Sequence, residues 1–160
     1  MAVRQHLAPA CRATSGTRIM LVLAALIANA CASGTAPTPT PGGMDEAIAN
    51  LVLRGVTIHS LVSGDPGCPT SDLHDNAVRL EVSFAAQSSI KDIYLFQWRR
   101  ASDYDAASEA FNDCVAEYGE LRPGVDITPV QATPWRAYGP GWGDDSKIVV
   151  EHALREAAGF

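Results

Sequence analysis

The chain has 160 residues, of which 47% are hydrophobic and 19% charged, and its net charge at pH 7 is −6. All 18 acidic residues follow Cys31, whereas three of the 12 basic residues precede it, so nine bases against 18 acids leave −9 beyond that cysteine. An acidic chain of this kind repels nucleic acid and anionic headgroups, and no basic stripe offsets the repulsion. Composition therefore excludes nucleic acid as a partner.

Residues 1–30 have the composition of a signal peptide. The apolar run 19–28 follows three arginines and no acid. A bilayer span needs about 20 apolar residues, so the run is too short to cross a membrane, but it has the length of a signal-peptide apolar region. Ala28 and Ala30 are small, as signal peptidase requires, and no basic stop-transfer cluster follows. We therefore expect export and removal of this segment.

The residues around Cys31 resemble the lipobox of bacterial lipoprotein precursors. Ala30 and Cys31 match its last two positions, whereas Ala28 stands where leucine is usual. The resemblance covers the first 31 residues and concerns where the protein is located, not its fold. It implies that Cys31 is acylated, with palmitate or a similar chain, and that the protein is anchored at the extracytoplasmic face of a cell membrane. The alternative is ordinary cleavage after Ala30, which would give a freely secreted protein.

Residues 32–43 favour the anchored alternative. They carry no charge and no large apolar side chain, and Pro37, Pro39 and Pro41 alternate with threonine. This composition favours extended polyproline II, in which such a tract reaches roughly 35 Å at about 3.1 Å per residue. We therefore predict a lipidated cysteine and a Thr/Pro/Gly tether over residues 31–43, followed by a single domain over residues 44–160.

Cys68 and Cys114 are the two cysteines that remain after Cys11 leaves with the signal peptide and Cys31 is acylated. Two cysteines in an oxidising compartment predict one disulfide. Closing a loop of about 47 residues would stabilise the domain by roughly 4 kcal/mol if the effect is chain entropy. A redox or metal-binding pair is disfavoured, because the sequence has no C-x-x-C motif.

The domain begins with a predicted helix over 45–54 and a predicted strand over 56–62. Asp45 is a candidate N-cap, and Gly55 suits the position after the helix. A single longer helix is the alternative, because the apolar stripe continues past Gly55. The β-branched residues that follow favour the strand.

Two alternating segments predict further strands over 77–84 and 92–98, after a loop over 63–76. In the second strand both faces are apolar, which predicts a central position in the sheet. One face carries Ile93, Leu95 and Gln97, and the other carries Tyr94, Phe96 and Trp98.

The strongest helix pattern covers residues 103–118. Ser102 and Asp105 suit a capping box, and Gly119 suits the exit. A buried stripe is predicted from residues spaced three or four apart: Tyr104, Ala107, Phe111, Cys114 and Tyr118. A disulfide from this stripe to Cys68 would hold the preceding loop against the helix.

The last third of the chain predicts an edge strand over 125–132, because Pro129 interrupts it. Residues 134–143 form a predicted loop that begins like a strand, and residues 144–158 form a predicted helix. These elements predict an α+β fold, a small antiparallel sheet covered by helices on one face, with one disulfide.

Catalytic motifs are absent from the sequence. There is no G-x-S-x-G, Cys114 is far from a helix N-terminus, and the glycines of 139–143 lack phosphate-loop spacing. We assign no catalytic residue and no cofactor. The polar residues that an enzyme would use are His59, His74, Asp65, Asp72, Asp75 and Asn76. Because Asp and Asn clusters in loops usually form turns, and metal-ligand spacing is missing, we assign no metal ligand.

The aromatic segment "PWRAYGPGWG" is the candidate binding surface. Its residues Trp135, Arg136, Tyr138 and Trp142 could stack on sugar rings or a partner's apolar groups if they are exposed. The alternative is that the tryptophans cap the core. On these grounds we expect a membrane-anchored, non-catalytic module that binds an envelope protein or glycan, with a small envelope hydrolase or ligand-binding enzyme as the alternative.

Overall fold

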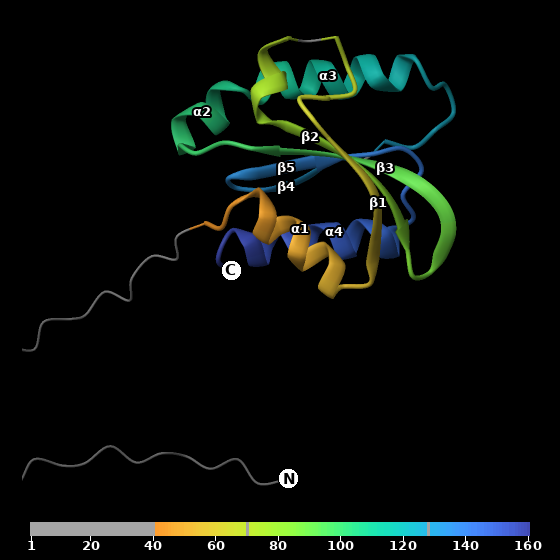
Figure 1. Cartoon of the computed structure of the whole chain (residues 1–160). Helices are drawn as coiled ribbons and strands as arrows, with labels where there is room; N and C mark the ends of the chain where they lie inside the picture. The colour runs from red at the N-terminus through yellow and green to blue at the C-terminus, as the bar shows by residue number, and fades with distance from the viewer. Residues whose placement is uncertain (1–40, 70, 128) are drawn as a thin grey trace, which may run out of the picture. The chain divides into compact units, whose positions relative to one another are not determined.

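The computed structural model describes residues 41–69, 71–127 and 129–160 (Figure 1). The predicted signal peptide, the lipidation site Cys31 and most of the predicted tether lie outside the described residues. The elements are α1 (Met44–Leu53), β1 (Val56–Ser63), the 3₁₀ helix η1 (Ser71–Asn76), β2 (Ala77–Phe84), β3 (Gln87–Gln97), α2 (Ala101–Ala106), α3 (Ser108–Glu120), β4 (Val130–Ala132), β5 (Trp135–Tyr138) and α4 (Asp144–Ala157).

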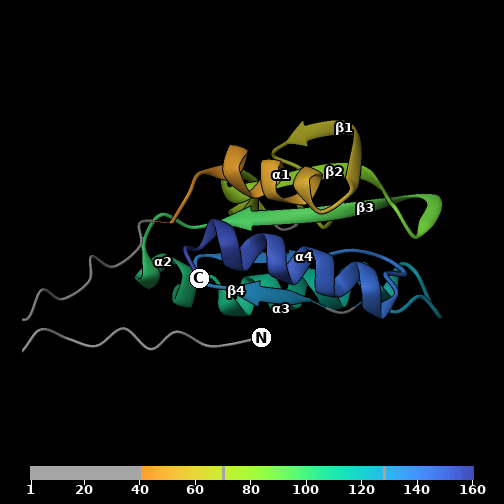
Figure 2. The same cartoon turned by 90° about the horizontal axis from the view of Figure 1, so that it is seen from below.

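The strands form one five-stranded sheet in the order β1-β2-β3-β5-β4, and every neighbouring pair is antiparallel. Figure 2 shows β1 and β4 at opposite edges of the sheet, with β3 between them. The predicted central position of β3 and the predicted edge position of the strand over 125–132 are both confirmed. Their lengths differ from the prediction, because β3 already begins at Gln87 and the edge strand β4 forms only after Pro129. An added residue at His59 shifts the register between β1 and β2.

Helices α1 and α4 pack side by side against one face of the sheet (Figures 1 and 2). The strands contribute the side chains that the alternating pattern predicted for this face, and the helices contribute small and branched residues. We call this group the aliphatic cluster; its most buried members are Leu51, Leu80, Val82, Ile93, Leu95, Trp135, Val150 and Leu154. Burying these apolar side chains is the main stabilising contribution on this side.

Helices α2 and α3 lie over the other face (Figure 1). Here the sheet contributes Tyr94, Phe96 and Tyr138, and we call the group around them the aromatic cluster. Its remaining members include Cys68, Leu73, Trp98, Tyr104, Phe111, Cys114 and Tyr118. The rings meet edge to face or offset-stacked, with Phe96 and Phe111 centroids 5.3 Å apart, the geometry that aromatic pairs favour.

The α+β class, the antiparallel sheet and the disulfide are thus confirmed, while the helices, expected on one face, lie on both. The reason lies in two of the three inner strands. β3 and β5 carry large apolar side chains on both faces, so each face needs a helical cover to remove them from water.

The predicted helix 103–118 is divided at Ala107 into α2 and α3. Its stripe is nevertheless buried at Tyr104, Phe111, Cys114 and Tyr118. The predicted capping box does not form, because α2 starts after Arg100, which makes no side-chain cap. The other predicted helices and the first two strands match the structure to within a residue or two at each end.

The predicted loop 134–143 begins as a strand, as expected, but the sequence did not indicate that this strand lies inside the sheet. Its first residues form β5, a strand whose four residues are all buried, inserted between β3 and β4. None of the helices in the described part of the chain has the length and apolar character needed to cross a bilayer.

Candidate functional site

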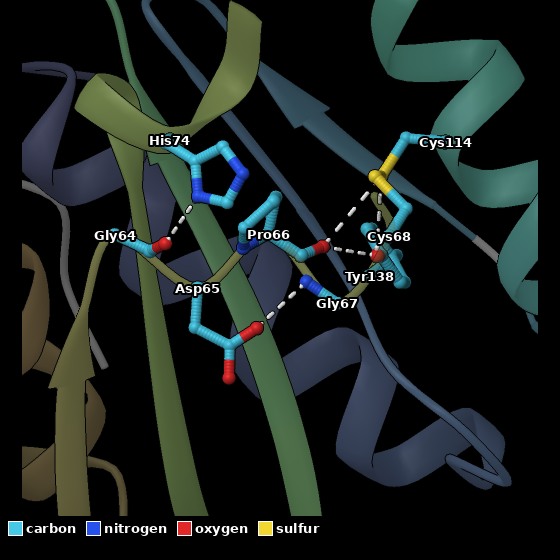
Figure 3. The surroundings of a disulfide bond; sticks show 8 residues. All are labelled: Gly64, Asp65, Pro66, Gly67, Cys68, His74, Cys114 and Tyr138. Carbon is cyan, nitrogen blue, oxygen red and sulfur yellow. Dashed lines mark hydrogen bonds between the residues drawn. A yellow bond between two sulfur atoms is a disulfide. The ribbon is translucent and has the colours of Figure 1, made fainter. Parts of the chain in front are cut away.

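The disulfide predicted between Cys68 and Cys114 is present, with a Cα–Cα distance of 5.4 Å (Figure 3). It joins the connection after β1 to the middle of α3, and both cysteines are buried. The bond therefore holds that connection against the helix, as the buried position of Cys114 on its stripe predicted.

The turn that carries Cys68 is also fixed by hydrogen bonds (Figure 3). Gly67 N donates to Asp65 Oδ1 at 2.9 Å, and His74 Nδ1 donates to the carbonyl oxygen of Gly64 at 2.6 Å. The Tyr138 hydroxyl donates to the carbonyl oxygen of Pro66. Gly67 has φ +78°, and a Cβ there would lie 2.6 Å from Tyr94 Cε1, so the turn requires glycine at this point.

Three tyrosines pack around this turn and lose contact with water. The ring centroids of Tyr94 and Tyr138 are 5.0 Å apart, and those of Tyr118 and Tyr138 are 5.2 Å apart. Burial raises the pKa of Tyr94, Tyr118 and Tyr138 above the ordinary tyrosine value. The hydroxyls therefore stay protonated at neutral pH, and the one of Tyr138 acts as a hydrogen-bond donor to Pro66 rather than as a base.

The candidate binding surface at Trp135, Arg136, Tyr138 and Trp142 is wrong, because these residues are at most 8% exposed. Side chains alternate along β5, so Trp135 enters the aliphatic cluster, whereas Arg136 and Tyr138 point into the aromatic side. Trp142 folds back and donates Nε1–H to the carbonyl oxygen of Asp92 at 3.1 Å. The alternative, in which the tryptophans cap the core, describes the structure.

Arg136 is a buried cation, only 2% exposed. Its Nη2 donates to the carbonyl oxygen of Tyr104 at 3.1 Å and to Ser108 Oγ at 2.5 Å. Its guanidinium lies 4.1 Å from the Tyr104 ring centroid and 5.2 Å from that of Phe111. These contacts lie at Ala107, where the helix is interrupted between α2 and α3 and the Tyr104 carbonyl oxygen accepts a hydrogen bond from Arg136. Arg136 therefore fixes the junction between α2 and α3.

The two histidines considered for catalysis do not meet each other or a carboxylate through any recorded contact among the described residues. His59 Nε2 lies 3.0 Å from Ser83 Oγ, and His74 bonds the Gly64 carbonyl. Asp65 instead pairs with Arg79 Nε at 2.8 Å. Within the described ranges, no group of three or more His, Cys, Asp or Glu side chains is arranged to hold a metal ion.

An open groove of about 870 Å³ lies between η1 and the α2–α3 junction, over the ends of β2 and β3. Buried Ala77 and Trp98 line it together with the small side chains of Ala106, Ala107 and Ala110. Its charged lining residues are Asp72 and Asp75 from η1, Arg99 and Arg100 from the β3–α2 connection, and Asp103 from α2. The two arginines make no ion pair with any residue that the structure describes.

The groove also includes Met44, the first residue of α1. Just before it, Gly42 N donates to the carbonyl oxygen of Ala157 at 2.7 Å, and Gln97 Nε2 donates to the carbonyl oxygen of Gly42 at 2.8 Å. The groove and the N-terminal start of the domain therefore lie at the same end. This groove was missed by the sequence analysis, because its residues come from four separate segments.

Searches against protein-family models, curated proteins and solved structures found no match to this chain.

Proposed function

We propose that the chain is a lipid-anchored, extracytoplasmic binding module. The observation that carries this proposal is the Cys68–Cys114 disulfide, because such bonds persist in oxidising compartments and are rare in the cytosol. It agrees with the signal-peptide composition of residues 1–30 and with the lipobox-like Cys31. In this proposal Cys31 carries the lipid, and the Thr/Pro/Gly tract holds the domain away from the membrane surface.

The groove between η1 and the α2–α3 junction is the surface that we propose for an envelope protein or glycan. Exposed Arg99 and Arg100 provide donors for carboxylate or phosphate groups, and exposed Asp75 provides an acceptor for amines or hydroxyls. The buried Trp98 and the alanines give the groove apolar walls. A mixture of apolar walls with a few charged groups is typical of binding sites.

A non-catalytic role is favoured over the hydrolase alternative. That alternative needed a histidine placed against a carboxylate in a concave site. His59 instead contacts a hydroxyl, and His74 contacts a backbone carbonyl, and neither residue lines the groove.

Substituting Cys31 tests the anchor. Cys31→Ser should leave unprocessed precursor or move the protein out of the membrane fraction, because the acyl chains would be absent. Cell fractionation followed by intact-mass measurement would show both results. Cys11→Ser is the matched control, because Cys11 lies in the segment that the proposal removes. A Cys31→Ser protein that partitions and migrates like the parent would contradict the anchor.

Reversing the charge of the two groove arginines tests the binding surface. Arg99→Glu with Arg100→Glu should abolish cross-linking of the domain to its envelope partner in intact cells, because the donors for the partner's anionic groups are replaced by acids. The control is Lys147→Glu on α4, which changes the charge outside the groove. Equal cross-linking by all three proteins would exclude the groove.

A further inference from the structure

Strand β1 leaves one edge of the sheet open. It is eight residues long, and its strand neighbour is β2 on one side alone. Its last three residues, Leu61, Val62 and Ser63, are exposed, with Leu61 51% and Val62 38% accessible. An edge of this kind presents unpaired backbone N–H and C=O groups to any strand that can lie beside it.

The opposite edge is protected. Strand β4 has only three residues, with Pro129 before it and Pro134 close behind it. The side chain of Gln131 is held by the Tyr104 hydroxyl, which donates to Gln131 Oε1 at 3.4 Å. Short strands, prolines and bulges are usual devices that prevent edge pairing. Of these, β1 has only the bulge at His59.

The irregularity of β1 at His59 divides the strand without covering it. After this position, Ser60, Leu61, Val62 and Ser63 pair with four consecutive residues of β2, from Glu81 back to Val78. The run 60–63 is therefore regular backbone that can accept a further strand on its free side. Leu61 lies opposite Leu80 and Val62 opposite Arg79, so the two apolar side chains point to opposite faces of the sheet.

The distribution of charge favours β1 over the helical segment 101–120 as the place where a second copy could approach. β1 contains no Asp, Glu, Lys or Arg. The helical segment 101–120 carries only acids among its charged residues: Asp103, Asp105, Glu109, Asp113, Glu117 and Glu120. Two copies of this acidic domain would repel each other through that side, whereas two β1 edges bring no like charges of their own into opposition.

We propose that β1 is a self-association edge, on which a second copy of this chain adds its own β1. Antiparallel pairing of identical strands about a two-fold axis gives a closed dimer. It continues the all-antiparallel pattern of the sheet and places Leu61 and Val62 of each copy beside the other copy's strand, on both faces. This inference does not rest on the lipid anchor or on the groove, although Ser63 at the end of the run also lines the groove.

The test uses residues 41–160, which contain both clusters and the disulfide. Sedimentation velocity from about 1 µM to about 1 mM should show a concentration-dependent shift from monomer to dimer, because a short edge interface gives a weak association. In the dimer, hydrogen exchange at amides of the run 60–63 should slow relative to the dilute protein.

The decisive variant is Leu61→Lys with Val62→Lys, which places like charges across the two-fold axis. It should weaken association by at least about tenfold. Ile148→Lys is the matched control, because Ile148 is also 51% exposed but lies on α4, and it should associate like the parent. A cooperative thermal transition confirms that each variant is folded.

Three results would overturn the proposal. The parent could remain monomeric at the highest concentration. The lysine variant could associate as well as the parent. A dimer could form without slower exchange in the run 60–63, which would place the interface elsewhere, for example at the groove.

Discussion

The two sides of the sheet are built from different chemistry. The aliphatic cluster under α1 and α4 is dominated by Leu, Val, Ile and Ala, whereas the aromatic cluster under α2 and α3 combines aromatic rings with the disulfide and borders the buried Arg136. On the aliphatic side, burial of apolar surface is enough to keep the helices packed against the sheet. The aromatic side contains hydroxyls and a cation that need particular partners, so its geometry is set by individual contacts as well as by packing.

The aliphatic side should be most sensitive to loss of its largest fully buried side chain, Trp135. Trp135→Ala should lower the free energy of unfolding by about 3–5 kcal/mol, because the fully buried ring leaves a cavity between the sheet and α4. Chemical denaturation measures the loss. Ile148→Ala, at an exposed position, should change stability by no more than about 0.5 kcal/mol. A loss below about 1 kcal/mol for Trp135→Ala would contradict the burial of this residue.

The second test acts on the aromatic side alone. Replacing both Cys68 and Cys114 by alanine should destabilise the domain by roughly 4 kcal/mol, because the unfolded chain is no longer cross-linked. NMR should show the largest shifts in the rings of Tyr94, Tyr118 and Tyr138, while α1 and α4 keep native resonances.

The control for that experiment is the mass of the parent domain, which should rise by two protons on reduction. Two free thiols in exported material, before any reductant is added, would contradict the disulfide. Equal spectral changes on the two sides would mean that the sides are not separable.

The stability of the aromatic side should also depend on pH, with a smaller effect than either substitution. Because the folded state raises the pKa of Tyr94, Tyr118 and Tyr138, the unfolded chain releases their protons first as the pH rises. Stability contributed by the protonated tyrosines is therefore full below about pH 10 and falls above it, by about 1.4 kcal/mol per pH unit for each tyrosine. Denaturation curves between pH 8 and pH 11, with Tyr138→Phe for comparison, measure the slope. The variant should have a shallower slope, and identical slopes would exclude Tyr138 from the effect.

The same contrast explains which features the sequence could predict. Strict polar–apolar alternation over 77–84 located one strand, because a strand with one buried face has a period of two. In 92–98, Ile93 and Leu95 alternate with the aromatic residues Tyr94 and Phe96, and this assigned the two faces of that strand. The pairing of Cys68 with Cys114 could be predicted, because only these two cysteines remain in the domain and an oxidising compartment was expected. The break at Ala107 could not be predicted, since it coincides with contacts from Arg136, which is distant in sequence.

The misplaced binding surface has a related cause. The segment was predicted to begin like a strand, but Gly139, Pro140 and Gly141 follow closely, so the pattern as a whole indicated an exposed loop. A strand that is buried on both faces loses the alternating signal, and an arginine within it suggests exposure. The groove was beyond prediction for a different reason, because tertiary packing alone brings its lining segments together.

The attachment of Gly42 has a mechanical consequence. Force applied to the chain ahead of this residue would meet two bonds at once, one to the last turn of α4 through Ala157 and one to the end of β3 through Gln97. Load would thus pass into the central strand and the terminal helix before it reached α1, which begins two residues later. A domain pulled at this point is loaded through its middle, so stretching the preceding segment would not peel α1 from the sheet as the first event.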